Sequence, residues 1–540
     1  MSSQYSWQQK ILCLIWLTYC ISIPKTYFGS QEYLQTFATK AVKANFADPQ
    51  IRSLIGTWQL TWGCAVYQIK KGSSSSNVND HTMYIAKYMD NPDLDQYVIA
   101  LAGTNPFSLQ NLLLEDVNVA TASPWNQGQP WKTAERLTKD NGEPAVSAGI
   151  TKALKDLTTA MWDGDQLLFD HLREITMNAS KPVEITVAGH SLAGAMAPSL
   201  ALSLVDRQAE WDAKHTTNIK VVSLAGFSPG NEAFARYYDQ TLGDKTERLW
   251  NQMDIVPNVW AVEGLRKIPR IYTPDIPPIL AVDIALKALE LSSQDQNYTH
   301  IKRTTEGFAS DFNPGFMIDN LPNDSDLKEV VLDVCTEFMA YPIILQLQSI
   351  PLVGDVTKDY VTDLVKEFSE EVRAVLDDVV TNNASSEELL KESLNGIISK
   401  ICGVDVNLFL FPIPDELEEL LSTGQVVRLI NFVLQVLFQH VWRYSRHYQF
   451  TEFDARRAEL TAQVASKMKV EESKVQTQNT VIVNYGSAKK DDVDDLLRGE
   501  GKLLRSISSV MEQLKQADQV SQNAQPVIFI VQKKKDSGKF

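Results

Sequence analysis

Apolar runs of strand length alternate with segments of helical spacing between residues 56 and 272. The strand-like runs are "WQLTWGCAVYQI", "TMYIAKYM", "DQYVIALAGT", "PVEITVAG", "IKVVSLAGFS" and "TERLWNQMD". The first two predict paired strands, joined by the polar loop "KKGSSSSNVNDH". Apolar residues spaced by three and four predict a helix over residues 147–177, and another helix is expected from Leu192. Strands that alternate with helices predict an α/β fold with a mostly parallel sheet covered on both faces.

The pattern changes after residue 313 and becomes almost wholly helical over residues 325–440. The stretch "VVRLINFVLQVLFQHVW" has a broad apolar face that is interrupted by Arg428, Asn431, Gln435 and Gln439. This predicts an amphipathic core or interface helix and not a membrane span. The polar end of the chain favours either a small strand-helix-strand appendage or a partly disordered tail.

These changes of pattern divide the chain into five parts. They are an N-terminal segment (1–25), an α/β core (26–312), a helical insertion (313–435), a return to the core (436–460) and a polar C-terminal extension (461–540). The insertion is expected to serve as a lid or as an accessory bundle.

The N-terminal segment carries the apolar run "ILCLIWLTYCISI", residues 11–23, directly after Lys10. The run is too short to span a bilayer but has the length of the apolar region of a signal peptide. It fits a buried N-terminal helix equally well. The run slightly favours a secreted or membrane-associated protein over a cytoplasmic one.

Composition narrows the classes of function. The 540 residues are 44% hydrophobic and 22% charged, so the chain has room for a large core. A net charge of −16 argues against a general nucleic-acid binder, which needs basic surface. The five cysteines include no C-x-x-C pair and the seven histidines lack metal-type spacing, so no structural zinc, disulfide framework or other cofactor is expected.

The stretch "VEITVAGHSLAGAMA", residues 183–197, reads as a strand, a corner that carries a serine, and a run of small residues. An esterase nucleophile is often presented on such a corner with the pattern G-x-S-x-G. Gly189 satisfies the pattern, whereas Ala193 replaces the second glycine, and a methyl group there is tolerated in a first helical turn. Ser191 is therefore a candidate nucleophile, with the Leu192 N–H at a helix N-terminus as an oxyanion donor. The alternative is a tight strand-to-helix turn, also made of Gly194 and its small neighbours, with an incidental serine.

Two further segments could complete such a site. Thr104 follows Gly103 at the end of a predicted buried strand, where a second oxyanion donor is expected; otherwise it is a turn residue ahead of Pro106. Asp254 follows another strand in "RLWNQMDIVPNVW", where the acid that orients a base belongs; otherwise it caps the turn.

Taken together, these motifs resemble the class 3 (fungal-type) lipase family of α/β-hydrolases over roughly residues 58–272. The segments that carry the resemblance are "GHSLAGAMAPSLAL", "LAGTNPFSLQNLLLEDV", "AGFSPGNEAFARYYD", "NQMDIVPNVW" and "IPRIY". The resemblance implies that Ser191 is the nucleophile, that Asp254 is the acid, and that Thr104 and Leu192 form the oxyanion hole. Besides Ala193, the chain departs from the family at Ala102, where an arginine often precedes the Gly-Thr pair.

The catalytic base is expected after the acid in the chain, which leaves His300, His440 and His447. His190 lies beside the serine but is expected to be a packing residue. The stretch "QHVWRY" resembles the glutamine-histidine-x-x-x-tyrosine segment that carries the base in bacterial-type members of the family. The resemblance therefore favours His440, with His300 as the alternative and His447 as a packing or surface residue.

The resulting prediction is a lipase-like serine hydrolase that cleaves carboxylic esters of lipids through an acyl-enzyme. A lipid or ester substrate and contact with a lipid–water interface are expected. One alternative is a non-catalytic binding or assembly protein on the same fold. Another is a phospholipase or short-chain esterase with the same triad.

Overall fold

The computed structural model describes residues 5–21, 30–68, 81–102, 119–318 and 422–484, with short pieces near 328–336, 373–377, 504–509 and 525–529. The predicted segments around Thr104, the loop at 69–80 and most of the helical insertion lie outside the described residues. The chain divides into two compact units, Met1–Thr461 and Ala462–Phe540.

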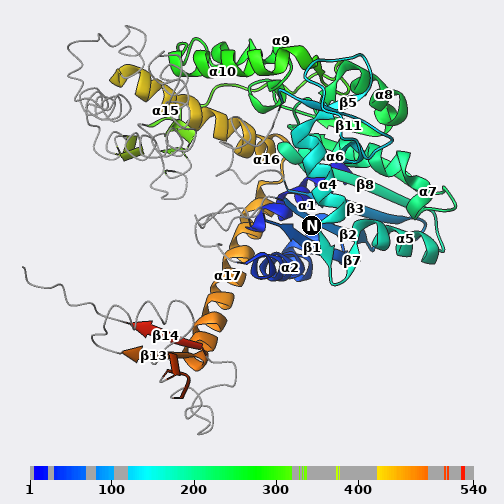
Figure 1. Cartoon of the computed structure of the whole chain (residues 1–540), viewed down its shortest axis with the longest axis vertical. Helices are drawn as coiled ribbons and strands as arrows, with labels where there is room; N and C mark the ends of the chain where they lie inside the picture. Colours follow the sequence, from blue (N-terminus) through cyan, green and yellow to red (C-terminus); the bar gives the residue numbers. More distant parts are fainter. Residues whose placement is uncertain are drawn as a thin grey trace, which may run out of the picture. The chain divides into compact units, whose positions relative to one another are not determined.

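A six-stranded sheet forms the centre of the first unit (Figure 1), in the order β1-β2-β3-β8-β9-β11. Its strands are β1 (Trp58–Tyr67), β2 (His81–Tyr88), β3 (Asp95–Leu101), β8 (Val183–His190), β9 (Asn218–Leu224) and β11 (Thr246–Leu249). Strands β3, β8, β9 and β11 run parallel, whereas β1 and β2 join the edge as an antiparallel pair. The predicted α/β class and mostly parallel sheet are confirmed.

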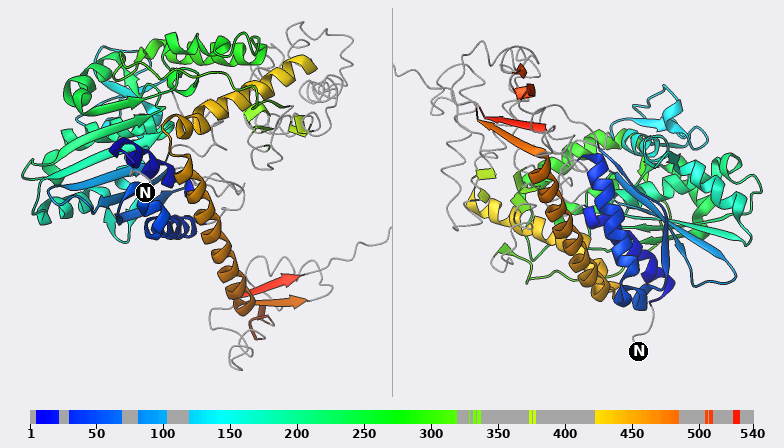
Figure 2. Two further views of the ribbon diagram at one scale, coloured as in Figure 1. Left: turned by 180° about the vertical axis from the view of Figure 1, so that it is seen from behind. Right: turned by 90° about the horizontal axis from the view of Figure 1, so that it is seen from below.

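Helices cover both faces of this sheet (Figure 2). Helices α4 (Ala148–Thr159) and α6 (Leu192–Asp206) pack on one face, against Ile99, Ile185 and Val187. Helices α1 (Trp7–Leu17) and α2 (Gln31–Ala47) lie on the other face, where the hydroxyl of Tyr84 donates to the carbonyl of Leu14 (2.7 Å). Because successive strand residues point to opposite faces, nearly continuous apolar strands are needed to fill both layers.

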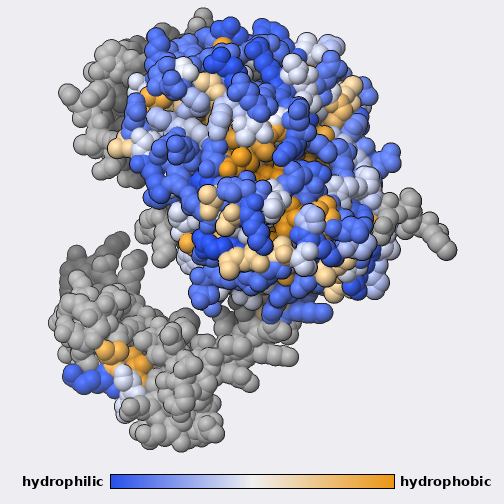
Figure 3. Space-filling view, turned by 90° about the vertical axis from the view of Figure 1, so that its right-hand side faces the viewer, coloured by the Kyte–Doolittle hydropathy of each residue, from blue (hydrophilic) through white to orange (hydrophobic). Residues whose placement is uncertain are grey.

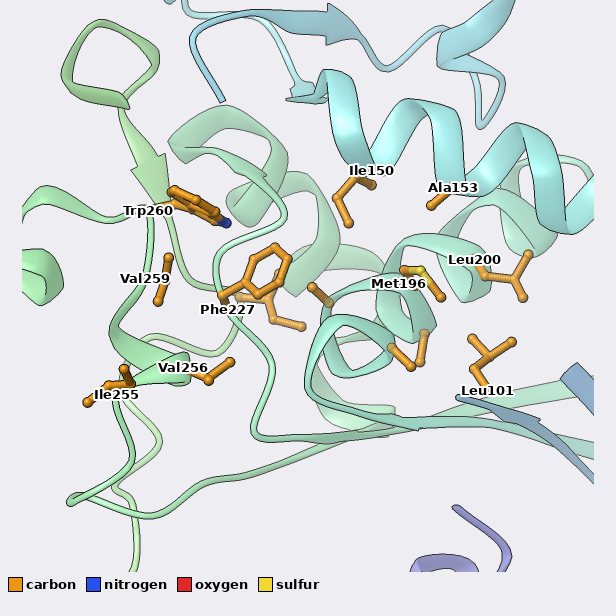
Figure 4. Close-up of a cluster of buried hydrophobic side chains, with 14 of the residues drawn as sticks. Leu101, Ile150, Ala153, Met196, Leu200, Phe227, Ile255, Val256, Val259 and Trp260 are labelled. Carbon is orange, nitrogen blue, oxygen red and sulfur yellow. The ribbon is translucent and has the colours of Figure 1, made fainter. Parts of the chain in front are cut away.

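A cluster of buried apolar side chains packs at the carboxyl edge of the sheet (Figure 4). Leu101 lies at the end of β3, and the side chains around it come from α4, α6 and the loops after β9 and β11. These are Ile150, Ala153, Met196, Leu200, Phe227, Ile255, Val256, Val259 and Trp260, all buried. Burying each larger side chain stabilises the fold by about 1.5–3 kcal/mol, so the cluster ties the start of α6 to the loop that follows β11.

The single helix predicted over residues 147–177 is wrong. Helix α4 ends at Thr159, a hairpin of β6 (Trp162–Asp163) and β7 (Gln166–Leu167) follows, and α5 (Leu168–Asn178) begins a second helix. The two-residue turn is Gly164-Asp165, with Gly164 at a φ of 61°. That conformation costs glycine little, and Gly-Asp between two strands is a hairpin signal.

A smaller sheet and short helices complete the first unit up to residue 318. The sheet has the order β12-β10-β5-β4, with β4 (Ala122–Pro124), β5 (Ala145–Ser147), β10 (Gly230–Asn231) and β12 (Tyr298–Thr299). The helices are α3 (Pro49–Ile55), α7 (Gln208–Trp211), α8 (Glu232–Leu242), α9 (Val262–Leu265) and α10 (Leu280–Ser293). The face in Figure 3 is mainly hydrophilic, with apolar groups gathered near its middle.

The predicted amphipathic helix is α15 (Thr423–Leu437). It continues through a π-helical turn, η12 (Phe438–Trp442), into α16 (Arg443–His447). Asn431 accepts a hydrogen bond from the Ile318 N–H (2.8 Å), and the Gln435 amide donates to the Asn313 carbonyl (2.7 Å). One turn later, Gln439 donates to the Asp311 carbonyl (2.9 Å). Side chains four apart share one helix face, so these amides bind the loop and turn of residues 311–318.

The apolar N-terminal run lies in α1 and the short helix η1 (Thr18–Ile21) as far as Ile21. The Ser6 hydroxyl caps α1, and Ile11 to Leu17 are buried. Within the described parts of the chain, no helix has both the length and the apolar character needed to cross a membrane.

The second unit contains a parallel strand pair, β13 (Thr480–Asn484) and β14 (Gln525–Phe529). Residues 504–505 and 507–509, between the two strands in sequence, are helical. Helix α17 (Thr451–Asn479) begins in the first unit and ends just before β13.

Candidate active site

Ser191 lies at a strained corner between β8 and α6. Its backbone has φ 64° and ψ −126°, a conformation that residues with a side chain rarely adopt. The Ser191 N–H donates to the Leu224 carbonyl (3.0 Å), and the Gly194 N–H donates to the Ser191 carbonyl (2.8 Å). Leu192 begins α6, so its N–H belongs to the helical turn that has no intrahelical acceptor. The structure therefore presents Ser191 on a sharp, strained turn between a strand and a helix.

Close packing explains which corner residues must be glycine. A Cβ atom on Gly189 would lie 2.6 Å from the Ala193 carbonyl carbon, and one on Gly194 would lie 2.8 Å from Gly226 Cα. Both contacts are with backbone that cannot move cheaply. The methyl group of Ala193 is itself fully buried in the apolar core, so this position accommodates alanine.

Asp254 is completely buried just beyond β11, and three hydrogen bonds converge on its carboxylate. Oδ2 accepts from His440 Nδ1 (2.8 Å) and from the Tyr444 hydroxyl (2.9 Å), and Oδ1 accepts from the Val256 N–H (3.0 Å). The structure thus joins Asp254 to a histidine 186 residues later in the chain.

His440 is buried on the π-helical turn η12. Because a carboxylate oxygen accepts from Nδ1, that nitrogen carries the hydrogen, and the lone pair of the neutral ring lies on Nε2. Nε2 is buried and has no hydrogen-bond partner among the described residues. The hydrogen bond to Asp254 therefore fixes the orientation of the ring, and Nε2 remains available to accept a proton. Single π-helical turns inside α-helices occur often at functional sites.

His190 connects the Ser191 corner to the Asp254–His440 pair. Its ring centroid lies 4.5 Å from that of His440, and its Nε2 donates to the His440 carbonyl (2.9 Å). Its Nδ1 accepts from the Tyr19 hydroxyl (2.8 Å), which comes from η1. Burial, followed by the nearby His440, holds the pKa of His190 well below its usual range, so the ring stays neutral. The residue before Ser191 therefore packs directly on His440.

His300 lies in other surroundings. It lines a polar pocket with Arg248, and burial together with that guanidinium holds the pKa of His300 well below its usual range. None of the hydrogen bonds that reach the Asp254 carboxylate comes from His300. His447 stacks on Phe308, with ring centroids 3.7 Å apart. Thr104 lies outside the described residues, and so does any contact it makes.

Sequence reasoning gave no role to several residues that support this arrangement. The Asn251 N–H donates to the Tyr444 hydroxyl (3.0 Å), and its side-chain amide donates to Gln439 Oε1 (2.8 Å). Tyr444 follows His440 by four residues, so both project from one helix face, and that spacing is visible in "QHVWRY". Nothing in the sequence, by contrast, links Tyr19 to His190. No group of three or more potential metal ligands occurs among the described residues.

Comparison with protein families identifies the central segment. The model of the class 3 lipase family matches residues 99–263. This lipase segment contains Ser191 and Asp254, whereas His440 lies 177 residues beyond its end (440 − 263). A second model, a family of unknown function (DUF6200), matches residues 466–539.

Several solved lipase structures are similar to the chain. M37 lipase is 24% identical with a TM-score of 0.48, over 67% of this chain and 98% of its own. Lipase II from Rhizopus niveus is 17% identical with a TM-score of 0.30, over 48% and 77% of the two chains. The lipase from Rhizopus microsporus var. chinensis is 17% identical with a TM-score of 0.30, over 47% and 70%. A comparison with curated proteins gave no match.

Proposed function

We propose that the chain is a serine hydrolase of lipid carboxylic esters, with Ser191 as nucleophile, His440 as general base and Asp254 as the acid that orients it. The observation that carries the proposal is the buried Asp254–His440 hydrogen bond of 2.8 Å beside a strained serine corner. The match of residues 99–263 to class 3 lipases supports a hydrolase of this general kind.

The proposed reaction uses the chain's own groups. His440 Nε2 takes the proton from Ser191 Oγ as that oxygen attacks the ester carbonyl carbon. The negative charge that develops on the carbonyl oxygen is stabilised by N–H groups, among them that of Leu192 at the start of α6. Asp254 stabilises the imidazolium. The proton then passes to the leaving alcohol, and water repeats the sequence to release the acid and restore Ser191.

The choice between His440 and His300 rests on the partner of Asp254. A base must be oriented by the acid, and the described carboxylate contacts favour His440. His300 lies among Arg248, Arg303 and Lys267, whose positive charges oppose the imidazolium that a base must become. Tyr444 and Val256 hold the carboxylate in place, which restricts the His440 ring to one orientation.

Labelling with a fluorophosphonate probe tests the proposal. The intact chain should label and should hydrolyse p-nitrophenyl esters, whereas S191A should not label. H440A should lose about 10³-fold or more in kcat, and H300A should remain active and serves as the control. An intact chain that neither labels nor hydrolyses esters of any chain length would favour the non-catalytic alternative. The same chain-length profile separates a lipase from a short-chain esterase.

A further inference from the structure

Arg248 is a buried cation with an unusual lack of partners. It lies on β11 with 6% of its surface exposed, and its guanidinium makes no hydrogen bond or ion pair with any described residue. Its described neighbour is the ring of Trp250, whose centroid lies 5.1 Å from the guanidinium carbon. Burial lowers the pKa of Arg248 to about 10. Asp239 and Tyr444 act on the guanidinium only from beyond ion-pair distance. A buried charge without a direct counter-ion is costly, which suggests that an anion from outside the chain completes this site.

The guanidinium lines a pocket of about 340 Å³ that contains other donors. Lys267 and Arg303 lie at its exposed rim, and each pairs with Glu263 at 3.2 Å. The lining therefore contains three cations and one carboxylate, and His300 also lines the wall. With His300 neutral, the lining carries a net charge of about +2, which favours a dianion over a single carboxylate.

We propose that this pocket binds a phosphate group, carried by a small phosphorylated molecule or by the headgroup of a lipid. A phosphate monoester carries about −1.5 to −2 charges at pH 7, which matches the lining. The planar guanidinium of Arg248 can hold two phosphate oxygens at once, and the Trp250 ring covers one side of it. The pocket is larger than a bare phosphate, so it has room for the group to which the phosphate is attached.

The phosphate site is separate from the proposed hydrolysis. None of Ser191, Asp254 and His440 lines the pocket, so loss of phosphate binding and loss of ester turnover are distinguishable results. The two sites share the turn η6 (Val256–Asn258). Asn258 lines the pocket and its side-chain amide donates to the Asp254 carbonyl (2.9 Å).

Calorimetric titration of the full chain with inorganic phosphate, at pH 7.5 and low salt, tests the proposal. Saturable binding is expected, and R248M should weaken it about tenfold or more because a charge-assisted contact is lost. R136M is the matched control, since Arg136 is exposed and contacts only backbone carbonyls nearby. R248M should also unfold at a temperature no lower than the wild type, because it removes an unpaired buried charge. K267Q, at the exposed rim, should weaken binding by a smaller factor. This variant tests the proposal by itself if R248M does not fold.

Further titrations distinguish the source of the phosphate. Binding of sn-glycerol 3-phosphate in solution would identify a small phosphorylated molecule. Binding only to vesicles that contain phosphatidic acid, lost in R248M, would identify a lipid headgroup. The proposal is overturned if neither phosphate nor phosphatidic acid binds, or if R248M binds as well as R136M. Displacement of phosphate by an equal concentration of acetate would also overturn it, since the pocket would then prefer a carboxylate.

Discussion

The side chain of His190 makes a hydrogen bond through each of its nitrogens, and each partner comes from a distant part of the chain. Tyr19 donates to Nδ1 from the N-terminal segment, and the His440 carbonyl accepts from Nε2. Both bonds require the same neutral tautomer, since a carbonyl can only accept. The Tyr19 hydroxyl therefore fixes the proton on the nitrogen that holds the backbone of the proposed base.

Substitution of Tyr19 by phenylalanine tests this link. Y19F should lower the free energy of unfolding by about 1–2 kcal/mol, because a buried nitrogen of His190 loses its donor. If Ser191 and His440 act as proposed, kcat for esters should fall several-fold with KM unchanged, measured by steady-state kinetics. Y237F is the matched control, since the Tyr237 hydroxyl donates to Asp206 (2.6 Å) elsewhere. Equal kcat values in the two variants would show that Tyr19 has a structural role alone.

The glycine pattern of the elbow gives a second prediction at this scale. G189A should lower the free energy of unfolding by at least about 2 kcal/mol, because its methyl group would meet the backbone of Ala193. A193G restores the family pattern but should cost about 0.5–1 kcal/mol, the helical penalty of glycine. Urea unfolding measures both. A more stable A193G would mean that the buried methyl group is strained.

The strained corner at Ser191 was predictable from the sequence because its requirements are local. A strand, a corner and small residues at fixed spacing identify Ser191, and the position after a strand end identifies Asp254. The contacts of Tyr19 and Asn251 were not predictable, since each depends on a partner far away in the chain. Met161 is a case in which the local pattern misleads. It is fully buried and continues the apolar spacing that predicted one helix over residues 147–177, but it lies beyond the end of α4.

At the scale of elements, the amides on α15 and η12 bind backbone, a role that the hydropathy pattern did not indicate. Asn431, Gln435 and Gln439 interrupt an apolar face, and a pattern of hydropathy cannot tell a solvated amide from a buried one with partners. The structure shows them bound to the segment 311–318, which is loop and turn, so these side chains supply hydrogen bonds that no strand ladder gives it. This also sets the position of η12, and with it His440.

Q435M tests the role of this amide row. The substitution leaves the Asn313 N–H and the Phe316 carbonyl without their partner and removes one of the two donors to the Asn313 carbonyl. The free energy of unfolding should therefore fall by about 2–3 kcal/mol. R428M, at an exposed position of the same helix, should change it by less than about 0.5 kcal/mol. Limited proteolysis should cut Q435M faster within residues 310–318. Identical cleavage of the two variants would contradict this account.

At the scale of the whole molecule, several histidines are buried in their neutral form. Burial is the largest cause in each case, and it lowers the pKa of His81 to about 3, with Lys152 adding to the effect. His190 and His300 are shifted in the same direction. In the unfolded chain these rings take up protons below about pH 6.5, while the folded chain does not. Acidification therefore favours the unfolded state.

The expected result is a loss of stability between about pH 6.5 and pH 5, before most carboxylates titrate. Each such histidine contributes up to about 1.4 kcal/mol per pH unit. H81F keeps the stacking on Tyr67 and removes the ionisable group, so its free energy of unfolding should fall less steeply with decreasing pH. Urea unfolding at pH 7.5, 6.5, 5.5 and 5.0 measures the slopes. Parallel slopes for H81F and the wild type would mean that His81 is protonated in the folded chain.

The position of helix α1 in the sequence affects how the protein folds during synthesis. This helix is synthesised before β3 and β8, against which it packs, and Val183 follows Leu17 by 166 residues (183 − 17). At about 5–20 residues per second, roughly 10–30 seconds pass before its second strand leaves the ribosome. For that interval the run "ILCLIWLTYCI" has no complete binding surface, and any factor that recognises exposed apolar segments on nascent chains can compete with the fold for it. The native sheet must then recapture α1, because only in the folded chain does Tyr19 reach His190.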